Sequence, residues 1–220
     1  MGLDVKLENG VQLHWATPIF TRKFDDTGEL NARLAKIILE RERQDPGVPK
    51  SVVHGWHSKE DFFEWPHPEV APVRDFVRRA MIELTSATTG HKEGEFGGEA
   101  EFIAWATVLR KGGYNSVHTH PGCAWSGVYY VDTGGAAASG DGGGCIEFID
   151  PRTAVEMVPL PGEPFGQRRR FEPEAGRMYA FPAWLGHGVT PYMGDDARIS
   201  IAFNIRMKDF QVFGVGGKPG

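Results

Sequence analysis

The stretch AEFIAWATVLR, residues 100–110, carries β-branched and aromatic residues in the alternating pattern of a β-strand. The run Lys111-Gly112-Gly113 follows it and predicts a turn. Similar short stretches recur along the rest of the chain. They predict further strands at 114–119, 125–131, 144–149, 155–158, 168–172, 177–181, 186–190 and 197–205. Short strands at regular intervals, separated by Gly and Pro, predict an all-β sandwich or barrel for this part of the chain.

The residues before Gly90 have a different character. An edge strand with a break at Pro18 is expected within 11–24. Apolar residues at helical spacing predict one helix from about Asp25 to Pro46 and a second within 68–89. The aromatic-rich segment 51–69 is interpreted as irregular. We therefore expect one domain, 1–220, in which a strand and two padding helices (1–95) cover a β core (96–210).

The composition limits the class of protein. The chain has 220 residues, of which 40% are hydrophobic and 24% charged, as in a soluble globular protein. Its net charge of −5 gives no reason to expect a nucleic acid or an anionic membrane as partner, and Arg168-Arg169-Arg170 is interpreted as a solvated loop. The charged N-terminus does not resemble a secretory signal, and two cysteines are too few for a disulfide framework. A cytoplasmic protein with free thiols is expected.

The stretch YNSVHTHPG, residues 114–122, contains a His-x-His pair. In a strand, His118 and His120 leave the same face, which is the geometry that two metal ligands need. The pair by itself is also consistent with two solvated imidazoles at a strand end. Cys123 lies three residues on, but Pro121-Gly122 is expected to turn its thiol away.

A third histidine lies in FPAWLGHGVTPY, residues 181–192. His187 sits between Gly186 and Gly188, which let backbone or ligand approach closely. A lone histidine at such a place is more often a surface or core residue. Two neighbouring imidazoles and a distant third nevertheless make a plausible open metal site.

Two strands carry candidate anion-binding groups. In DARISIAFNI, residues 196–205, Arg198, Ser200, Ala202 and Asn204 share one face. An Arg beside a Ser on an inward face can clamp a carboxylate, although an edge-strand Arg can also extend to water. In SGVYYVD, residues 126–132, Tyr130 shares a face with Ser126 and Val128 and offers a phenol either to packing or to an anion.

Taken in order, these motifs resemble a known family. The stretches HTHPGCAWSGVYYV (118–131), CIEFIDPR (145–152), FPAWLGHGVTPY (181–192) and RISIAFNIR (198–206) look like the 2-oxoglutarate/Fe(II)-dependent oxygenase family. They resemble the prolyl-hydroxylase-like side of that superfamily and, more narrowly, an uncharacterised bacterial branch of it. The strong resemblance covers about 100–206, and ATPIF (16–20) and GWHSKEDF (55–62) fit the branch more loosely.

The resemblance implies a double-stranded β-helix, or jelly-roll, core with iron at its open end. Carried over by position, His118, His120 and His187 are the metal ligands for Fe(II). Tyr130, Arg198 and Ser200 match the positions that hold the distal carboxylate of the co-substrate 2-oxoglutarate. The implied activity is a dioxygenase that oxidises its substrate by hydroxylation-type chemistry.

His120 departs from the family pattern, which has Asp or Glu at this position. Three neutral imidazoles leave Fe(II) with its full charge, which still suits a dianionic co-substrate. Two alternatives stay open for an enzyme: a cupin-like three-histidine metalloenzyme that does not use 2-oxoglutarate, and a zinc site with three histidines and water. A non-catalytic jelly-roll binding module is the third.

Other features carry weaker expectations. Asp150-Pro151-Arg152 predicts a turn with an internal salt bridge, and the loop 132–144 is interpreted either as a lid or as a flexible connection. Trp125 and Trp184 are candidate pocket walls. His54, His57 and His67 are expected at the surface or near the substrate. The substrate, a small molecule or a peptide, is not determined by the sequence, and exposed strand edges make a homodimer plausible.

Overall fold

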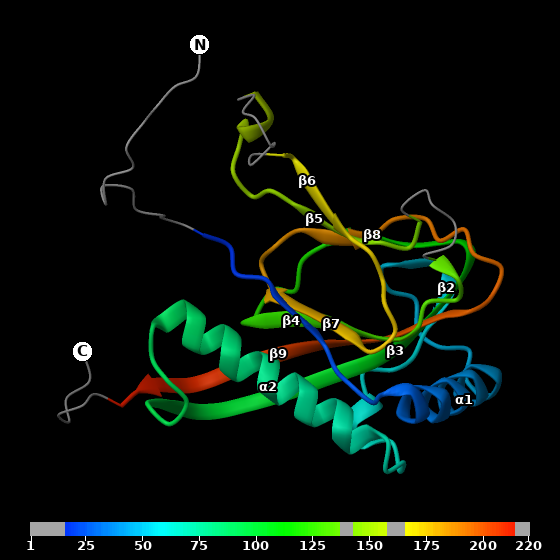
Figure 1. The fold of residues 1–220 in the computed structure, drawn as a ribbon, viewed down its shortest axis with the longest axis horizontal. Helices are drawn as coiled ribbons and strands as arrows, with labels where there is room; N and C mark the ends of the chain where they lie inside the picture. The colour runs from blue at the N-terminus through cyan, green and yellow to red at the C-terminus, as the bar shows by residue number, and fades with distance from the viewer. Residues whose placement is uncertain (1–15, 137–142, 158–165, 214–220) are drawn as a thin grey trace.

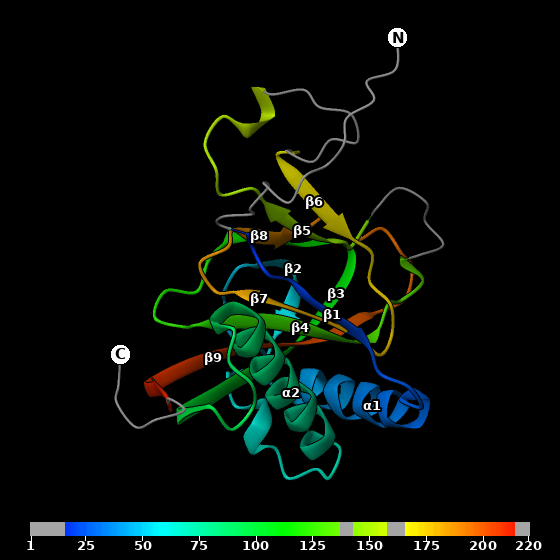
Figure 2. The same cartoon turned by 60° about the vertical axis from the view of Figure 1, so that its left-hand side comes forward.

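The fold consists of a curled antiparallel sheet with two helices packed on one side, as the computed structural model shows (Figure 1). The structure describes residues 16–136, 143–157 and 166–213. Its strands form two facing layers, with β5, β6 and β8 above and β1, β4, β7 and β9 below (Figures 1 and 2). This is the expected mainly β, jelly-roll arrangement with flanking helices.

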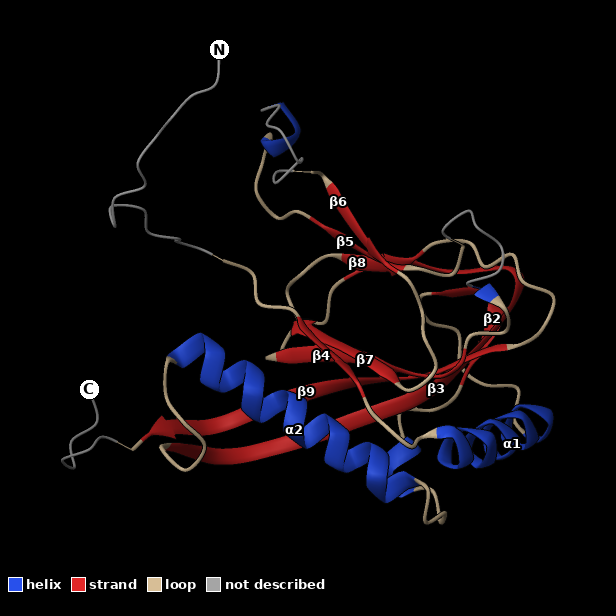
Figure 3. Ribbon diagram, viewed as in Figure 1, coloured by secondary structure: helices blue, strands red, loops and turns tan. Residues whose placement is uncertain are grey.

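Both α-helices precede the long strand β3 in the chain, and most of the strands follow it (Figure 3). Their bounds are β1 Phe20–Lys23, α1 Gly28–Gln44, β2 Val52–His57, the 3₁₀ helix η1 Phe62–Glu64, α2 Val70–Thr89, β3 Phe96–His118, β4 Trp125–Asp132, β5 Ile146–Ile149, the 3₁₀ helix η3 Val155–Met157, β6 Arg168–Phe171, β7 Arg177–Pro182, β8 His187–Val189 and β9 Arg198–Val212. No helix among the described residues is long and apolar enough to cross a membrane.

The long strand β3 joins the two layers. The hydrogen-bonded order is β1-β7-β4-β9-β3-β8-β5-β6, and β2 also pairs with β3. The first part of β3 pairs with β9, as far as Leu109 opposite Arg198. Its last part pairs with β8, where Asn115 lies opposite Val189 and His118 opposite His187. β3 therefore links β9 of the lower layer to β8 of the upper layer. Through these pairings Arg198 of β9 and His187 of β8 come to the same space between the layers.

The main core lies between the two helices and the lower layer. α1 contributes Leu34 and Ile38, and α2 contributes Val73 and Val77, all of them buried. The sheet contributes the outward face of β9, with Ile199, Ile201, Phe203 and Ile205, to the same core. The opposite face of β9 is thereby left to line the space between the layers. α2 ends at Gly90, which adopts the left-handed conformation with φ of 77°.

Three expectations about local structure are wrong. Residues 111–113 do not form a turn, because Gly112 (φ 84°) lies inside the continuous β3, which changes partners at this point. Residues 155–157 form a 3₁₀ helix instead of a strand, and residue 158 lies outside the described residues. The segment 51–69, interpreted as irregular, contains β2, which pairs with β3.

Other boundaries are closer to expectation. Only residues 20–23 of the predicted edge strand are a strand, and 11–15 lie outside the described residues. Both helices and the strands near 125–131, 144–149, 168–172, 177–181, 186–190 and 197–205 are present, the last extending to Val212. The arginine run is not a solvated loop, since it forms β6 and two of its members form ion pairs with buried Glu147. Residues 137–142 of the predicted lid lie outside the described residues.

Position 127 in β4 requires glycine, because neighbouring atoms leave no room for a Cβ atom. A Cβ at this position would lie 2.6 Å from the carbonyl oxygen of Tyr179 and would clash with the ring of Phe203. Gly127→Ala is therefore expected to lower the free energy of unfolding by about 1–3 kcal/mol in urea denaturation. Gly28→Ala is the matched control, because no atom of the described residues outside its chain neighbours and its own helix backbone lies within 4 Å of a Cβ there. Equal stability of the two variants would contradict the prediction.

Candidate metal centre and anion pocket

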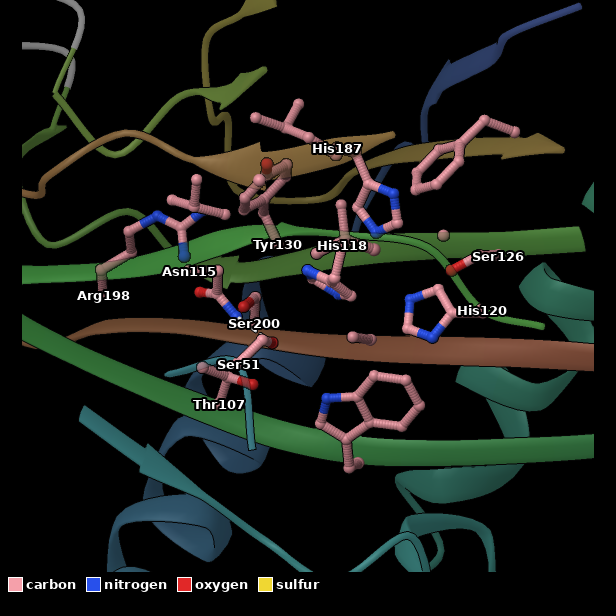
Figure 4. A pocket seen from close by; sticks show the side chains of 18 residues that line it. Ser51, Thr107, Asn115, His118, His120, Ser126, Tyr130, His187, Arg198 and Ser200 are labelled. Carbon is pink, nitrogen blue, oxygen red and sulfur yellow. Dashed lines mark hydrogen bonds between the residues drawn. The ribbon is translucent and has the colours of Figure 1, made fainter. Parts of the chain in front are cut away.

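Three histidines converge between the layers (Figure 4). His118 ends β3 and His187 begins β8, and the two residues are directly opposite in the strand pairing. His120 lies two residues beyond β3, where its backbone N–H donates to the carbonyl oxygen of Ala183 at 2.9 Å. The ring centroids are 4.5 Å apart for His118 and His187, 4.8 Å for His118 and His120, and 5.2 Å for His120 and His187.

The ring nitrogens of this cluster can meet at one ion. One nitrogen from each ring lies within 4.8 Å of the other two. Nδ1 of His118 is 2.7 Å from the carbonyl oxygen of Ser116, and Nδ1 of His187 is 2.8 Å from that of Leu185. A carbonyl oxygen only accepts, so both Nδ1 atoms carry the proton and both Nε2 atoms keep a free lone pair. This is the arrangement that metal-ligating histidines usually show.

Burial keeps two of these imidazoles neutral. Desolvation lowers the pKa of His187 to about 3, and the hydrogen bond to the Leu185 carbonyl only partly opposes it. Desolvation likewise lowers the pKa of His120 to about 4. Neutral imidazole is the form that binds a metal ion. Both side chains are therefore in their ligating protonation state at neutral pH.

The lowered pKa values predict how the stability of the metal-free protein depends on pH. An unfolded histidine takes up a proton near pH 6.5, whereas folded His187 and His120 do so only near pH 3 and 4. The unfolded chain thus binds more protons between these values, so the free energy of unfolding falls as the pH drops. From pH 6.5 to about pH 5, each imidazole is expected to contribute a loss of at most about 2 kcal/mol.

Urea denaturation in the presence of a chelator, at about pH 7 and about pH 5, measures this loss. The variant His187→Gln cannot titrate at that position and should lose less stability than the wild type over the same interval. An equal loss in both proteins would contradict the assignment of this pH dependence to His187.

A buried cation lies further along the same interior. Arg198 is 1% exposed, and its guanidinium carbon is 5.0 Å from the centroid of the Tyr130 ring. Nε and Nη2 of Arg198 and the hydroxyl of Tyr130 are buried and have no hydrogen-bond partner among the described residues. Burial raises the pKa of Tyr130 to about 12, with the charge of Arg198 opposing, so the phenol stays protonated. These groups are donors without an acceptor, an arrangement that is costly unless an anion occupies the space.

One pocket connects the two groups. It has a volume of about 530 Å³, including its open mouth, and both the histidines and the Arg198 region line it. Ser200 lies beside Arg198 on the inward face of β9, opposite Thr107 in the pairing with β3 and opposite Tyr130 in the pairing with β4. The inward faces predicted for β4 and β9 are confirmed, because Ser126, Val128, Tyr130, Arg198, Ser200 and Ala202 all line the pocket.

The sequence missed part of the lining. Trp105 and Thr107 belong to the pocket wall, and their spacing of two in β3 was a signal that they share a face. Ser51 and Asn115 complete a polar side, with Asn115 donating to the Ser51 hydroxyl at 3.4 Å. Ser51 had no local signal, because it lies next to β2 in the segment that was interpreted as irregular, whereas Asn115 lies in β3, where the pairing with β8 is irregular between Asn115 and His118.

Several weaker expectations have clear outcomes. Trp125 does not wall the pocket but packs in the core beneath the helices, and Trp184 is 56% exposed. His54 and His67 are exposed, whereas His57 is only 4% exposed and stacks on Trp105 at 5.3 Å, so its surface placement is wrong. The turn at Asp150 is confirmed, with Arg152 donating to both carboxylate oxygens.

The donors present fit a divalent metal and a dianion. Three imidazoles supply nitrogen ligands of the kind that iron accepts. Cys123 does not belong to this cluster of candidate ligands, as the turn at Pro121-Gly122 predicted. Among the described residues, no carboxylate forms an ion pair with Arg198. The pocket therefore offers positive charge at one end and metal ligands at the other.

Comparison with known families supports this interpretation. Residues 103–204 match a family model described as "Putative 2OG-Fe(II) oxygenase". The matched segment contains all three histidines, Tyr130, Arg198 and Ser200. The match confirms the resemblance found in the sequence. No curated protein matches the chain.

Solved structures share the fold. A prolyl-4-hydroxylase from Pseudomonas putida superposes with a TM-score of 0.56 at 16% identity, covering 86% of this chain and 92% of its own. A prolyl hydroxylase from Trichoplax adhaerens, in complex with a hypoxia inducible factor peptide, superposes with a TM-score of 0.56 at 11% sequence identity. The superposition covers 86% of this chain and 83% of that structure's chain. HygX from Streptomyces hygroscopicus, with nickel and 2-oxoglutarate bound, superposes with a TM-score of 0.55 at 11% sequence identity. The superposition covers 88% of this chain and 84% of the HygX chain. At these identities the likeness shows the fold alone.

Proposed function

We propose that this enzyme, which belongs to the 2-oxoglutarate- and Fe(II)-dependent oxygenases, binds its iron through His118, His120 and His187. We further propose that Arg198, Tyr130 and Ser200 hold the distal carboxylate of 2-oxoglutarate. The activity of the family is a dioxygenase reaction in which 2-oxoglutarate is the co-substrate. The residue assignments are specific to this chain and can each be tested.

The observation that carries the proposal is a single pocket with a metal-ligating triad and an unsatisfied buried cation. The triad presents ring nitrogens within 4.8 Å of one another. Arg198 and Tyr130 point unpartnered donors into the same pocket. A ligand with a chelating head and a distant carboxylate satisfies both requirements at once, and 2-oxoglutarate is such a ligand.

The chain's own residues bind and orient the co-substrate. The guanidinium of Arg198 offers a planar pair of N–H donors that matches a carboxylate, and the phenol of Tyr130 and the hydroxyl of Ser200 add one donor each. Because Arg198 is buried, this charge pairing takes place away from solvent screening. The fixed distal carboxylate then directs the 2-oxo acid end toward the histidines.

Bound iron supplies the oxidative chemistry, in which dioxygen converts 2-oxoglutarate to succinate and carbon dioxide while the substrate is oxidised. The protein around the triad restricts access to that chemistry. The ring of Phe181 contacts the His187 ring with centroids 4.5 Å apart, and the ring of Phe148 lies 6.5 Å away. These apolar rings exclude water from one side of the centre and restrict the orientation of the ligand.

The histidine at position 120 changes the charge of the centre. A carboxylate ligand would neutralise one charge of the metal, whereas three neutral imidazoles leave both. The resulting positive potential favours a dianionic co-substrate near the metal. We infer that His120 preserves the use of 2-oxoglutarate, and that it makes binding of that anion more dependent on the metal.

The partners and cellular location remain proposals from the sequence. We propose a small molecule or a peptide as substrate, and neither a nucleic acid nor a membrane surface as partner, on the basis of the net charge of −5. A cytoplasmic location and a homodimer joined through exposed strand edges belong to the same proposal. Light scattering of the purified protein measures the oligomeric state.

The experiment that tests the function measures binding and turnover together. Calorimetry under anaerobic conditions should show one 2-oxoglutarate bound per chain when Mn(II) is present. Fe(II)-loaded protein in air should then release succinate from 2-oxoglutarate. Metal binding without any 2-oxoglutarate binding would favour the cupin-like three-histidine metalloenzyme, and tetrahedral zinc as the native metal would favour a hydrolytic or hydration site. Absence of metal binding would contradict the proposal and leave a binding module.

A further inference from the structure

His120 differs from the other two histidines in its hydrogen bond. Its Nδ1 lies 3.1 Å from Nδ2 of Asn204, whereas Nδ1 of each of the other two faces a carbonyl oxygen. Asn204 is 8% exposed and lies on the inward face of β9. Its Oδ1 is buried and has no hydrogen-bond partner in the part of the chain that the structure describes. The contact therefore leaves one strong acceptor unsatisfied.

The proton positions in this contact oppose metal binding. If Nδ2 of Asn204 donates to Nδ1 of His120, then Nδ1 has no proton and Nε2 carries it. Nδ1 is already occupied by Asn204, so Nε2 is the nitrogen left to bind a metal ion. A protonated Nε2 has no lone pair to offer. In this arrangement His120 is in the wrong tautomer to act as a ligand.

Rotation of the Asn204 amide by 180° resolves both problems. It exchanges Oδ1 and Nδ2, so that Oδ1 accepts a proton from Nδ1 of His120. The orphan acceptor gains a partner, and Nε2 becomes a free ligand atom. All three histidines then donate from Nδ1 to an oxygen, as metal-ligating histidines commonly do.

We propose that Asn204 is a positioning residue that selects the ligating tautomer of His120 through its Oδ1 atom. This inference rests on the proposed metal site. It also gives a physical reason for pairing a histidine at position 120 with an amide at position 204. A carboxylate ligand binds a metal through either oxygen, but an imidazole must have its proton on the nitrogen away from the metal. The acceptor of Asn204 meets that additional requirement.

Three variants separate this role from simple packing. Asn204→Ala removes the acceptor and should weaken Mn(II) binding by about 10–100-fold in calorimetry. Asn204→Asp has almost the same shape but can only accept, so it should bind Mn(II) as tightly as the wild type or more tightly. Asn31→Ala is the matched control, because it removes an amide that is buried to a similar extent but accepts from the Tyr129 hydroxyl in the core, outside the histidine cluster and the pocket lining. It should leave the affinity unchanged.

A spectroscopic measurement reads the tautomer directly. Nitrogen-15 NMR of protein loaded with diamagnetic Zn(II) should show His120 protonated at Nδ1, in both the wild type and Asn204→Asp. Asn204→Ala should show partial loss of that tautomer or loss of His120 from the coordination sphere. Thermal denaturation of each metal-free variant measures any general loss of packing, which a tautomer effect does not require.

The outcomes distinguish this inference from the function on which it rests. Wild-type affinity for Mn(II) in Asn204→Ala, or weaker binding in Asn204→Asp than in Asn204→Ala, would overturn the role of Asn204 but leave the metal site intact. Protonation of His120 at Nε2 in the Zn(II)-loaded protein would overturn it as well. If the wild type bound neither metal, the proposed function itself would fail.

Discussion

Replacing His187 by alanine is expected to weaken Mn(II) or Fe(II) binding by more than about 100-fold, beyond the loss that follows when only a supporting residue is removed. His187 is 7% exposed, and its Nδ1–H bond to Leu185 directs Nε2 into the cluster. Without it only the two imidazoles of His118 and His120 remain in the cluster. Two adjacent imidazoles bind iron far more weakly than a convergent triad because the ion keeps more of its waters.

Metal analysis after dialysis, together with calorimetric titration, measures this loss. His67→Ala is the control, because His67 is exposed and lies outside the cluster. Circular dichroism of both variants should match the wild type. Retention of one metal ion per chain in His187→Ala would contradict the assignment of His187 as a ligand.

Replacing Arg198 by methionine should lower the affinity for 2-oxoglutarate by at least about 30-fold. The magnitude follows from the 2–5 kcal/mol, roughly, that removal of one partner costs in a buried, hydrogen-bonded charge pair. Arg198→Lys should have an intermediate effect, since an ammonium keeps the charge but not the planar pair of donors.

The same substitution should act differently on the ligand-free protein. The Nε and Nη2 atoms of Arg198 are buried and have no hydrogen-bond partners within residues 16–136, 143–157 and 166–213, so removing the charge takes away a cost of folding. The stability of ligand-free Arg198→Met should therefore equal or exceed that of the wild type, and its Mn(II) affinity should be unchanged. This combination separates a binding residue from a structural one.

Calorimetry with 2-oxoglutarate at saturating Mn(II), and urea denaturation without ligand, test the two halves of this prediction. Unaltered 2-oxoglutarate binding in Arg198→Met would show that the cation does not hold the distal carboxylate. It would favour the three-histidine metalloenzyme that works without 2-oxoglutarate.

Much of the site follows from local pattern. Alternation along β9 predicted that Arg198 and Ser200 face inward, and the pocket contains both. The histidine pair predicted a common face for His118 and His120, and the rings lie 4.8 Å apart although His120 is beyond the end of β3. These predictions succeed because a strand's side-chain direction is fixed by its own backbone, with a period of two residues.

Other features depend on which strands become neighbours. The turn predicted at Lys111–Gly113 is wrong because β3 continues through Gly112, where its partner β9 is replaced by β8 while β2 pairs with it before and after this point. The positive φ that glycine allows is used here for a bend inside a strand, which the residue pattern cannot distinguish from a turn. Burial of His57 and the placement of Ser51 followed the same unrecognised pairing of β2.

The sequence by itself determined the residue types, their faces on the strands and the family that its motifs resemble. Only the tertiary structure decided that His187 meets His118 across the sheet, that Nε and Nη2 of buried Arg198 have no hydrogen-bond partner among the described residues, and that Asn204 reaches His120. The physical reason is that strand periodicity is a local property of the backbone. Contacts between residues 84 positions apart, such as His120 and Asn204, depend instead on the register and curvature of the whole sheet.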